Sequence, residues 1–279
     1  NGAKKGICKM LDFESAVIRA PQFVPAEAYS ATFFNLNIKK LYDELYNILS
    51  KFDPMTAAQL NQPLFAGPDG QGGLQLKADI IDHLGSNIVM ATKMSKPLTD
   101  DGEATPVSIT ALAISNRSGL ERSLSLLHEK FTGANPDAKR ELLGHTIYVV
   151  DLSMFLPFLG GGMSMRPMQL PGETGAPPMP KLAFTVTDTH LILGTESTVE
   201  QVIRRLDSSA ESVASAKWFT TAKLAIPSVV GLAWLQDNAA SGEFFWRMLK
   251  KSAGAGQERK ALMGIALGPN PGLLFSQMG

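Results

Sequence analysis

Residues 182–194 read Leu182-Ala183-Phe184-Thr185-Val186-Thr187-Asp188-Thr189-His190-Leu191-Ile192-Leu193-Gly194, and this stretch decides the fold. Large apolar side chains alternate with small or hydroxyl ones up to Thr187. Such alternation predicts a strand, with Leu182, Phe184 and Val186 pointing inward and Ala183, Thr185 and Thr187 outward. Asp188 and Thr189 form a turn, and residues 190–194 return as a second strand. The stretch therefore predicts an antiparallel hairpin.

A helix is expected directly after the hairpin, over residues 197–206. Ser197-Thr198-Val199-Glu200 has the spacing of a capping box, and the apolar residues that follow share one helical face. The same reasoning predicts helices over 38–52 and 118–131, the latter opened by a capping box at Ser118. We expect their apolar faces to be buried against a sheet, including Leu45 in the first and Leu124 in the second.

Further strands are predicted over residues 30–36, 88–92, 107–115 and 146–151, where apolar and β-branched residues gather. Strand pairs followed by a helix recur along the chain. This order predicts an α+β fold: a mainly antiparallel sheet, amphipathic helices packed on one face, and repeated strand-strand-helix units.

A larger repeat organises the whole chain. Pro25, an apolar strand and an aromatic-rich helix resemble Pro227, a predicted strand over residues 229–235 and a second aromatic-rich helix. We therefore divide the chain into a lead-in segment over 1–22, a first α+β unit over 23–210 with a Gly/Pro/Met-rich insertion at 160–180, and a partial second copy over 218–279. Two outcomes fit an incomplete copy: residues 218–279 complete the sheet of the first unit, or, as we favour, more chain beyond Gly279 or another subunit covers them.

The amino-acid composition limits which kinds of molecule the chain is expected to bind. The chain has 26 basic and 26 acidic residues, which argues against nucleic acid, because phosphate binding needs a basic excess. Charged residues are only 19%, below the usual value of about 25%. This is consistent with a surface covered by another protein, a second subunit or the rest of a longer chain, and a monomer with a bland surface fits it equally well. No apolar run reaches the roughly 18 residues of a transmembrane helix. Cys8 is the only cysteine, which excludes an internal disulfide.

Three segments carry a resemblance to a known family. They are Val24-Pro25-Ala26-Glu27, the strand–turn–strand–helix block over 184–202, and Ala216-Lys217-Trp218-Phe219. Their order, over roughly residues 24–235, resembles a family of uncharacterised, mostly secreted bacterial proteins that share a domain of unknown function. The resemblance implies an export signal upstream and hence an extracytoplasmic location, in the periplasm or cell envelope. It implies no activity, cofactor or catalytic residue.

Candidate catalytic residues are sparse. The four histidines, His83, His128, His145 and His190, show none of the spacings typical of zinc sites. There is no Gly-x-Ser-x-Gly sequence to hold a nucleophilic serine. Asp79 and Asp82 lie three residues apart, on what should be a solvated face. We interpret the chain as having no catalytic residue, no cofactor and no enzymatic activity.

One segment is unusual: Gly160–Met168 is rich in glycine and methionine. The thioethers of Met163, Met165 and Met168 are soft ligands that suit Cu(I). The favoured alternative is contact with a partner, because methionine makes an adaptable apolar surface. Phe155 and Phe158 precede the segment and would extend that contact, or would let it touch a membrane surface.

These observations favour a non-enzymatic structural or protein-binding module of a bacterial extracytoplasmic protein. A carrier of an apolar ligand such as a lipid is the first alternative, since both classes need apolar faces on strands and helices. An enzyme of a type without a recognisable signature is the second.

Overall fold

The computed structural model describes residues 13–66, 73–94, 106–133, 135–151 and 181–254, and it is an α+β protein with a mostly antiparallel sheet, as expected. The chain forms two compact units, each made of three segments. Unit 1 contains residues 1–14, 34–88 and 109–208, and unit 2 contains residues 15–33, 89–108 and 209–279. Three strands pass from one unit into the other, namely β2 (Ala28–Asn35), β5 (Leu84–Met94) and β6 (Pro106–Ile114).

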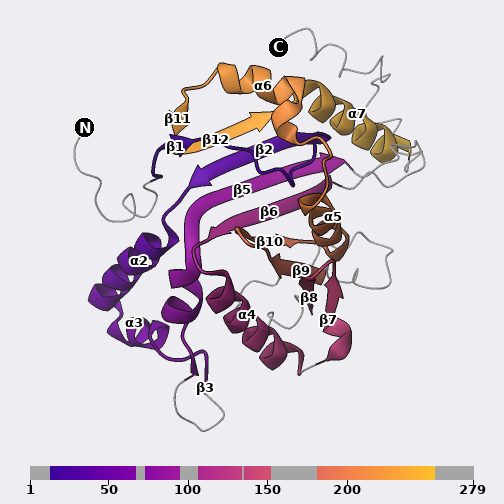
Figure 1. Ribbon diagram of the computed structural model, residues 1–279. Coiled ribbons are helices and arrows are strands. Elements are labelled where there is room, and N and C mark those ends of the chain that lie inside the picture. Colours follow the sequence, from indigo (N-terminus) through magenta and orange to yellow (C-terminus); the bar gives the residue numbers. More distant parts are fainter. Residues whose placement is uncertain (1–12, 67–72, 95–105, 134, 152–180, 255–279) are drawn as a thin grey trace, which may run out of the picture. The chain divides into compact units, whose positions relative to one another are not determined.

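In unit 1 the strand order is β5-β6-β10-β9-β8-β7 (Figure 1). The other strands of this order are β7 (Lys139–Leu142), β8 (His145–Asp151), β9 (Lys181–Val186) and β10 (His190–Gly194), and β3 (Phe65–Ala66) pairs separately with β4 (Gly73–Leu74). The helices are α2 (Ile38–Phe52), α3 (Pro54–Leu60), α4 (Arg117–Thr132) and α5 (Glu196–Leu206), with single turns η1 (Leu76–Ile80), η2 (Ile81–His83) and η3 (Pro136–Ala138). The predicted hairpin is confirmed, since β9 and β10 pair antiparallel with Leu191 opposite Val186.

Helix α4 covers one face of the strands β8, β9 and β10. Leu120 and Leu124 of the helix pack into a cluster with alternate residues of the strands. The strand residues of this cluster are Leu84 at the start of β5, Tyr148, Val150, Phe184, Val186 and Leu191. The expected burial of Leu124 is confirmed, at 8% exposure.

Helix α5 covers the opposite face, so the predicted packing of the helices on one face is not confirmed. Arg140 lies opposite Ile147 in the β7–β8 register, on the other face from Tyr148, and it forms ion pairs with Glu196 and Glu200 of α5. Four strand residues on this face are fully buried, namely Ile147, Ala183, Thr185 and Ile192. Figure 1 shows the two helices on different sides of these strands.

The predicted outward direction of Ala183, Thr185 and Thr187 is correct only as a direction away from α4. All three are buried, because α5 and not solvent lies on that face. Thr187 satisfies its hydroxyl within the hairpin, where Oγ1 donates to the carbonyl oxygen of His190 at 2.9 Å. Alternation of small and large residues therefore marked two unequal buried faces rather than a core and a solvent face.

Both predicted capping boxes are displaced by two residues. Asn116 caps α4, with Oδ1 accepting from the backbone N–H of Gly119 at 3.1 Å, and Thr195 caps α5, with Oγ1 accepting from Thr198 at 3.3 Å. Asn116 is favoured because its short side chain reaches the third amide of the helix. Glu121, the expected partner in the first box, instead contacts Arg117.

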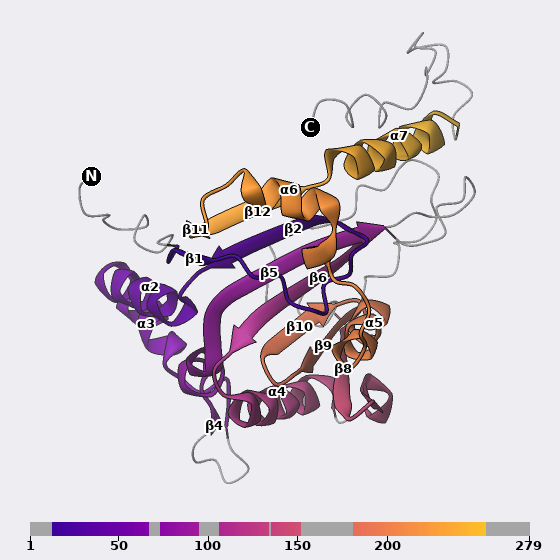
Figure 2. The ribbon, with the colours of Figure 1, turned by 45° about the horizontal axis from the view of Figure 1, so that its top comes forward.

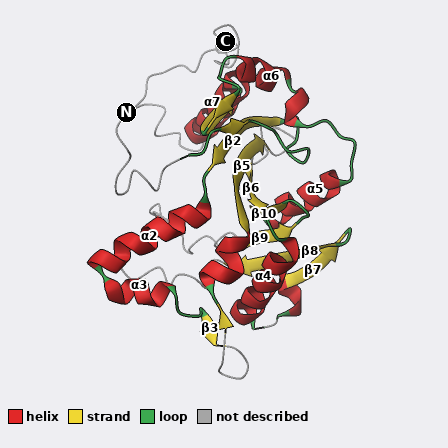
Figure 3. Ribbon diagram, turned by 60° about the vertical axis from the view of Figure 1, so that its left-hand side comes forward, coloured by secondary structure: helices red, strands yellow, loops and turns green. Residues whose placement is uncertain are grey.

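Helices α2 and α3 form an adjacent pair (Figure 3). Asp53 links them, since its backbone N–H donates to the carbonyl of Leu49 while its side chain caps α3. The expected burial of the apolar face of α2 is wrong at two of its positions: Leu45 is 36% exposed and Phe52 84% exposed. Tyr42 is the buried residue of α2, and its hydroxyl donates to the carbonyl of Leu60.

Unit 2 contains the strand order β12-β2-β5-β6. Its remaining elements are β1 (Ala16–Val17), β11 (Val229–Val230), β12 (Leu232–Gln236), η5 (Val213–Ser215), α6 (Lys217–Leu224) and α7 (Asn238–Gly254). Helix α6 contacts β12, and Phe219 of α6 packs against Phe33 of β2 with ring centroids 5.9 Å apart. β1 pairs antiparallel with β11, so part of the predicted lead-in over 1–22 is a strand.

The predicted division of the chain stays a prediction. It rests on a sequence repeat of consecutive segments, whereas the two compact units are defined by contacts, and unit 2 combines residues 15–33 and 89–108 with those after position 208. The predicted insertion at 160–180 and the last residues of the predicted second copy lie outside the described residues.

Candidate functional site

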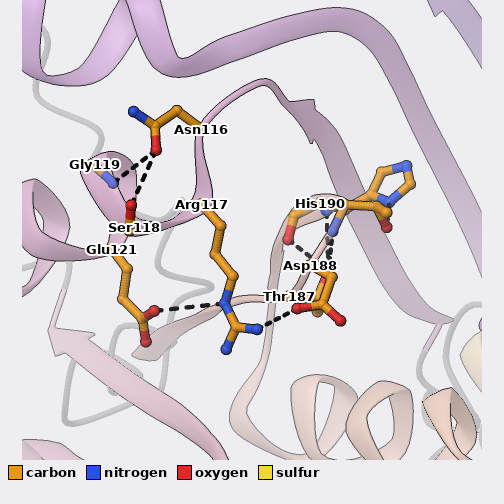
Figure 4. Close-up of polar contacts among 9 residues, drawn as sticks. Asn116, Arg117, Ser118, Gly119, Glu121, Thr187, Asp188 and His190 are labelled. Atoms are coloured by element: carbon orange, nitrogen blue, oxygen red, sulfur yellow. Dashed lines mark hydrogen bonds and ion pairs between the residues drawn. The ribbon is translucent and has the colours of Figure 1, made fainter.

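The turn between β9 and β10 and the first turn of α4 form a polar cluster (Figure 4). Arg117 forms an ion pair with Asp188 of the turn, and its Nε lies 3.6 Å from Oε2 of Glu121. Ser118 donates from Oγ to Oδ1 of Asn116 at 3.2 Å. An amide oxygen is too weak a base to activate a hydroxyl as a nucleophile. The ion pair therefore ties the hairpin to the helix.

His190 belongs to the same turn but faces away from Arg117 (Figure 4). Its backbone N–H donates to Oγ1 of Thr187 at 3.0 Å, and its Nδ1 lies 2.8 Å from Oγ1 of Thr189. Burial lowers the pKa of the imidazole, because the charged form is disfavoured away from water. These contacts fit a structural role for His190, in which a neutral imidazole bonds to Thr189 and stabilises the turn.

The other histidines have separate surroundings. His128 is buried in α4 and donates to the carbonyl oxygen of Val149, with its ring edge-on to Tyr148 at 5.1 Å. His83 lies against Gly119 at the start of α4. His145 begins β8. In the residues that the structure describes, no group of three or more His, Cys, Asp or Glu could hold a metal ion.

The predicted acidic pair has structural partners. Oδ2 of Asp79 accepts from the backbone N–H of Gln75 at 2.6 Å. Asp82 lies 3.1 Å from Nζ of Lys77, which also contacts Asp43. The hydrogen bond to Asp82 raises the pKa of the Lys77 ammonium. Each of the two carboxylates thus has its own partner: the backbone N–H of Gln75 for Asp79, and the ammonium of Lys77 for Asp82.

A different surface stands out in unit 2, along β12 (Figure 2). β12 is last in the strand order, next to β2, and in the described part of the chain no strand pairs with its other side. Ala233 and Leu235 are buried, whereas Leu232 and Trp234, on the alternate face, are 49% and 67% exposed. We define the β12 edge surface as Leu232, Trp234 and the unpaired side of the strand.

The β12 edge surface carries no charged side chain, and a hydrogen bond fixes the position of its Trp234 ring. Residues 229–236 contain no Asp, Glu, Lys or Arg. Nε1 of Trp234 donates to Oγ of Ser30 on β2 at 3.1 Å, which holds the indole across the sheet. An exposed edge strand with large apolar side chains is a template for pairing with another strand.

Some of the other exposed apolar side chains lie on helices, among them Leu224 at the end of α6 and Phe245 on α7. Met55 at the start of α3 lies near Phe52 in sequence, and both are exposed. Helices satisfy their own backbone hydrogen bonds, so these positions offer apolar contact alone. The β12 edge surface offers apolar contact and unpaired backbone groups together.

Sequence reasoning identified residues 229–235 as a strand but missed its exposure. The residues predicted to contact a partner or Cu(I) are Phe155, Phe158, Met163, Met165 and Met168, and all lie outside the described residues. None of the described helices is long and apolar enough to cross a membrane. Comparison of the chain with protein-family models, with curated proteins and with solved structures finds no match.

Proposed function

We propose that this chain is a non-enzymatic protein-binding module of a bacterial extracytoplasmic protein, and that the β12 edge surface makes the contact. The observation that carries the proposal is the coincidence, on one short strand, of an unpaired edge with the exposed side chains of Leu232 and Trp234. The extracytoplasmic location is supported by the family resemblance of residues 24–235.

Large apolar side chains on a pairing edge suit recognition of another chain. Trp is among the residues that contribute most to protein–protein binding, because it buries a large area with few rotatable bonds. The bond from Trp234 to Ser30 already restricts the indole, so less side-chain entropy is lost when a partner covers it. The carrier and enzyme alternatives gain no support from any arrangement described above.

The repeat within the chain belongs to the same proposal. β12 ends at Gln236 and α7 begins at Asn238, much as β2 ends at Asn35 and α2 begins at Ile38. Asp237 precedes α7 and accepts from the backbone N–H of Ala239 and Ala240, as Asn37 accepts from Lys40 before α2. This correspondence supports the prediction that residues 218–279 are a partial second copy.

Site-specific photo-crosslinking tests the proposal. A photoreactive phenylalanine analogue replaces Trp234 in the full chain, in the organism that makes it, and the crosslinked products are identified by mass spectrometry. The control carries the analogue at Leu224, which is more exposed but lies on α6. We expect one defined protein product from position 234 and none from position 224. Equal products from both positions, or none from position 234, would contradict the proposal.

A further inference from the structure

We propose that the partner of the β12 edge surface is β12 of a second copy of this chain, with the two strands paired antiparallel about a two-fold axis. This rests on the proposed function and adds the identity of the partner. It follows from the direction of the backbone groups, the symmetry of the pairing and the distribution of charge.

The backbone groups of β12 divide between its two sides. The N–H of Asp237 donates to the carbonyl oxygen of Tyr29 on β2 at 2.7 Å. Since alternate residues of a strand bond to the same neighbour, Leu235 and Ala233 also turn their amides toward β2. The regular alternation of exposure along residues 232–236 fits a strand without a bulge. The amides and carbonyls of Leu232, Trp234 and Gln236 therefore point to the unpaired side.

Three outward residues at even spacing are self-complementary. If Trp234 lies opposite its counterpart in the second copy, Leu232 of each copy lies opposite Gln236 of the other. All outward N–H and C=O groups then bond across the axis, because an antiparallel pair exchanges two hydrogen bonds at every second residue. The two indoles lie on the same face of the joined sheet and cover one another and the neighbouring Leu232 side chains.

Charge permits this pairing at β12 and opposes it at β7, the last strand at the other end of the order in unit 1. β7 contains Lys139, Arg140 and Glu141, and Arg140 is held by Glu196 and Glu200. Charged residues on a short edge strand are a common protection against pairing. β12 has no such residue, and a chain with 26 acidic and 26 basic residues carries no net charge to keep copies apart.

Light scattering coupled to size-exclusion chromatography of the purified full chain tests the inference. We expect a concentration-dependent dimer of twice the 30.0 kDa chain mass. Leu232→Pro removes one outward amide while sparing the bonds to β2, and Trp234→Lys places like charges opposite one another. Each should weaken dimerisation by at least about tenfold. Leu224→Lys, the same kind of change on α6, should leave it unchanged.

Disulfide trapping keeps the test independent of folding defects. Trp234→Cys in a Cys8→Ser background should give a covalent dimer on mild oxidation, whereas Leu224→Cys in that background should not. A wild-type chain that stays monomeric at every concentration, or a dimer that survives both β12 substitutions, overturns the inference. In that case a product with a different protein in the crosslinking experiment would leave the proposed function standing, and the absence of any product would remove both.

Discussion

His128 of α4 donates a hydrogen bond from Nε2 to the carbonyl oxygen of Val149 on β8 at 3.1 Å, inside the core of unit 1. The ring is 5% exposed and packs edge-on against Tyr148 and Phe184. A core histidine with a single backbone partner joins the helix to the strand at one defined position.

Replacing His128 should therefore destabilise the protein. His128→Leu keeps much of the volume but deprives the carbonyl of Val149 of this donor, which should cost roughly 1–3 kcal/mol. Urea unfolding followed by circular dichroism measures the change. Leu126→Ala, at an exposed position of the same helix, is the control and should cost less than about 0.5 kcal/mol. Equal losses would show that the bond contributes nothing.

Both faces of β10 are buried, so neighbouring residues of this strand should be equally sensitive to truncation to alanine. Leu191 belongs to the α4 face and is 7% exposed, and Ile192 faces the α5 side and is 0% exposed. Leu191→Ala and Ile192→Ala should each lower the free energy of unfolding by about 2–5 kcal/mol. A sheet covered on one face only would give one large and one negligible loss, so the pair discriminates between the two architectures.

Leu124 and Leu45 both lie on predicted apolar helix faces, but replacing them should affect stability to different degrees. Leu124→Ala removes a side chain from the α4 core and should cost about 2–5 kcal/mol, whereas Leu45→Ala, at a half-exposed position of α2, should cost less than about 1 kcal/mol. Thermal unfolding monitored by calorimetry measures both. A large loss for Leu45→Ala would mean that α2 buries this face in solution.

The stability of the chain should depend on pH through His190. Burial lowers the pKa of this imidazole below its ordinary value of 6.5 in the folded state. Below pH 6.5 the unfolded chain takes up a proton that the folded chain rejects, so the stability falls as the pH falls through that value and below it. Above pH 6.5 both states are neutral at this residue, and it contributes no pH dependence.

The matched variant is His190→Gln, which keeps a polar side chain at the turn. The difference in free energy of unfolding between pH 7.5 and pH 5.5 should be smaller for this variant than for the wild type. The nearby charged residues Arg117 and Asp188 are present in both proteins, so their effects cancel in the comparison. An unchanged difference would show that His190 is solvated like a free imidazole.

Local patterns predicted the helices and the hairpin well because these elements depend on nearby residues. The predicted helix over 38–52 coincides with α2, and residues 190–194 coincide with β10. The caps were misplaced because Thr195 and Ser197 both offer hydroxyls, and local spacing alone does not tell which one reaches the free amide. Amphipathic spacing identified a face on α2 but does not supply the neighbour that would bury it, as Leu45 shows.

The β12 edge surface could not be predicted, for a different reason. The alternation of Leu232 and Trp234 with Ala233 and Leu235 suffices for a strand. Whether such a strand is central or last in a sheet depends on the order of strands distant in sequence. Here β12 lies next to β2, about two hundred residues earlier in the chain, and only the three-dimensional structure reveals that no other described strand pairs with its far side.

The hydrogen bond between Ser30 and Trp234 joins residues 204 positions apart, and this separation determines the order in which the units can fold during synthesis. The ribosome releases the N-terminal strands of unit 2 first, yet β1 and β2 meet β11 and β12 only after all of unit 1 has been synthesised. Unit 1 can assemble its α4 and α5 layers while translation proceeds. Unit 2 closes last, because its long-range contacts form slowly, and until then β2 has only β5 as a neighbour in the sheet.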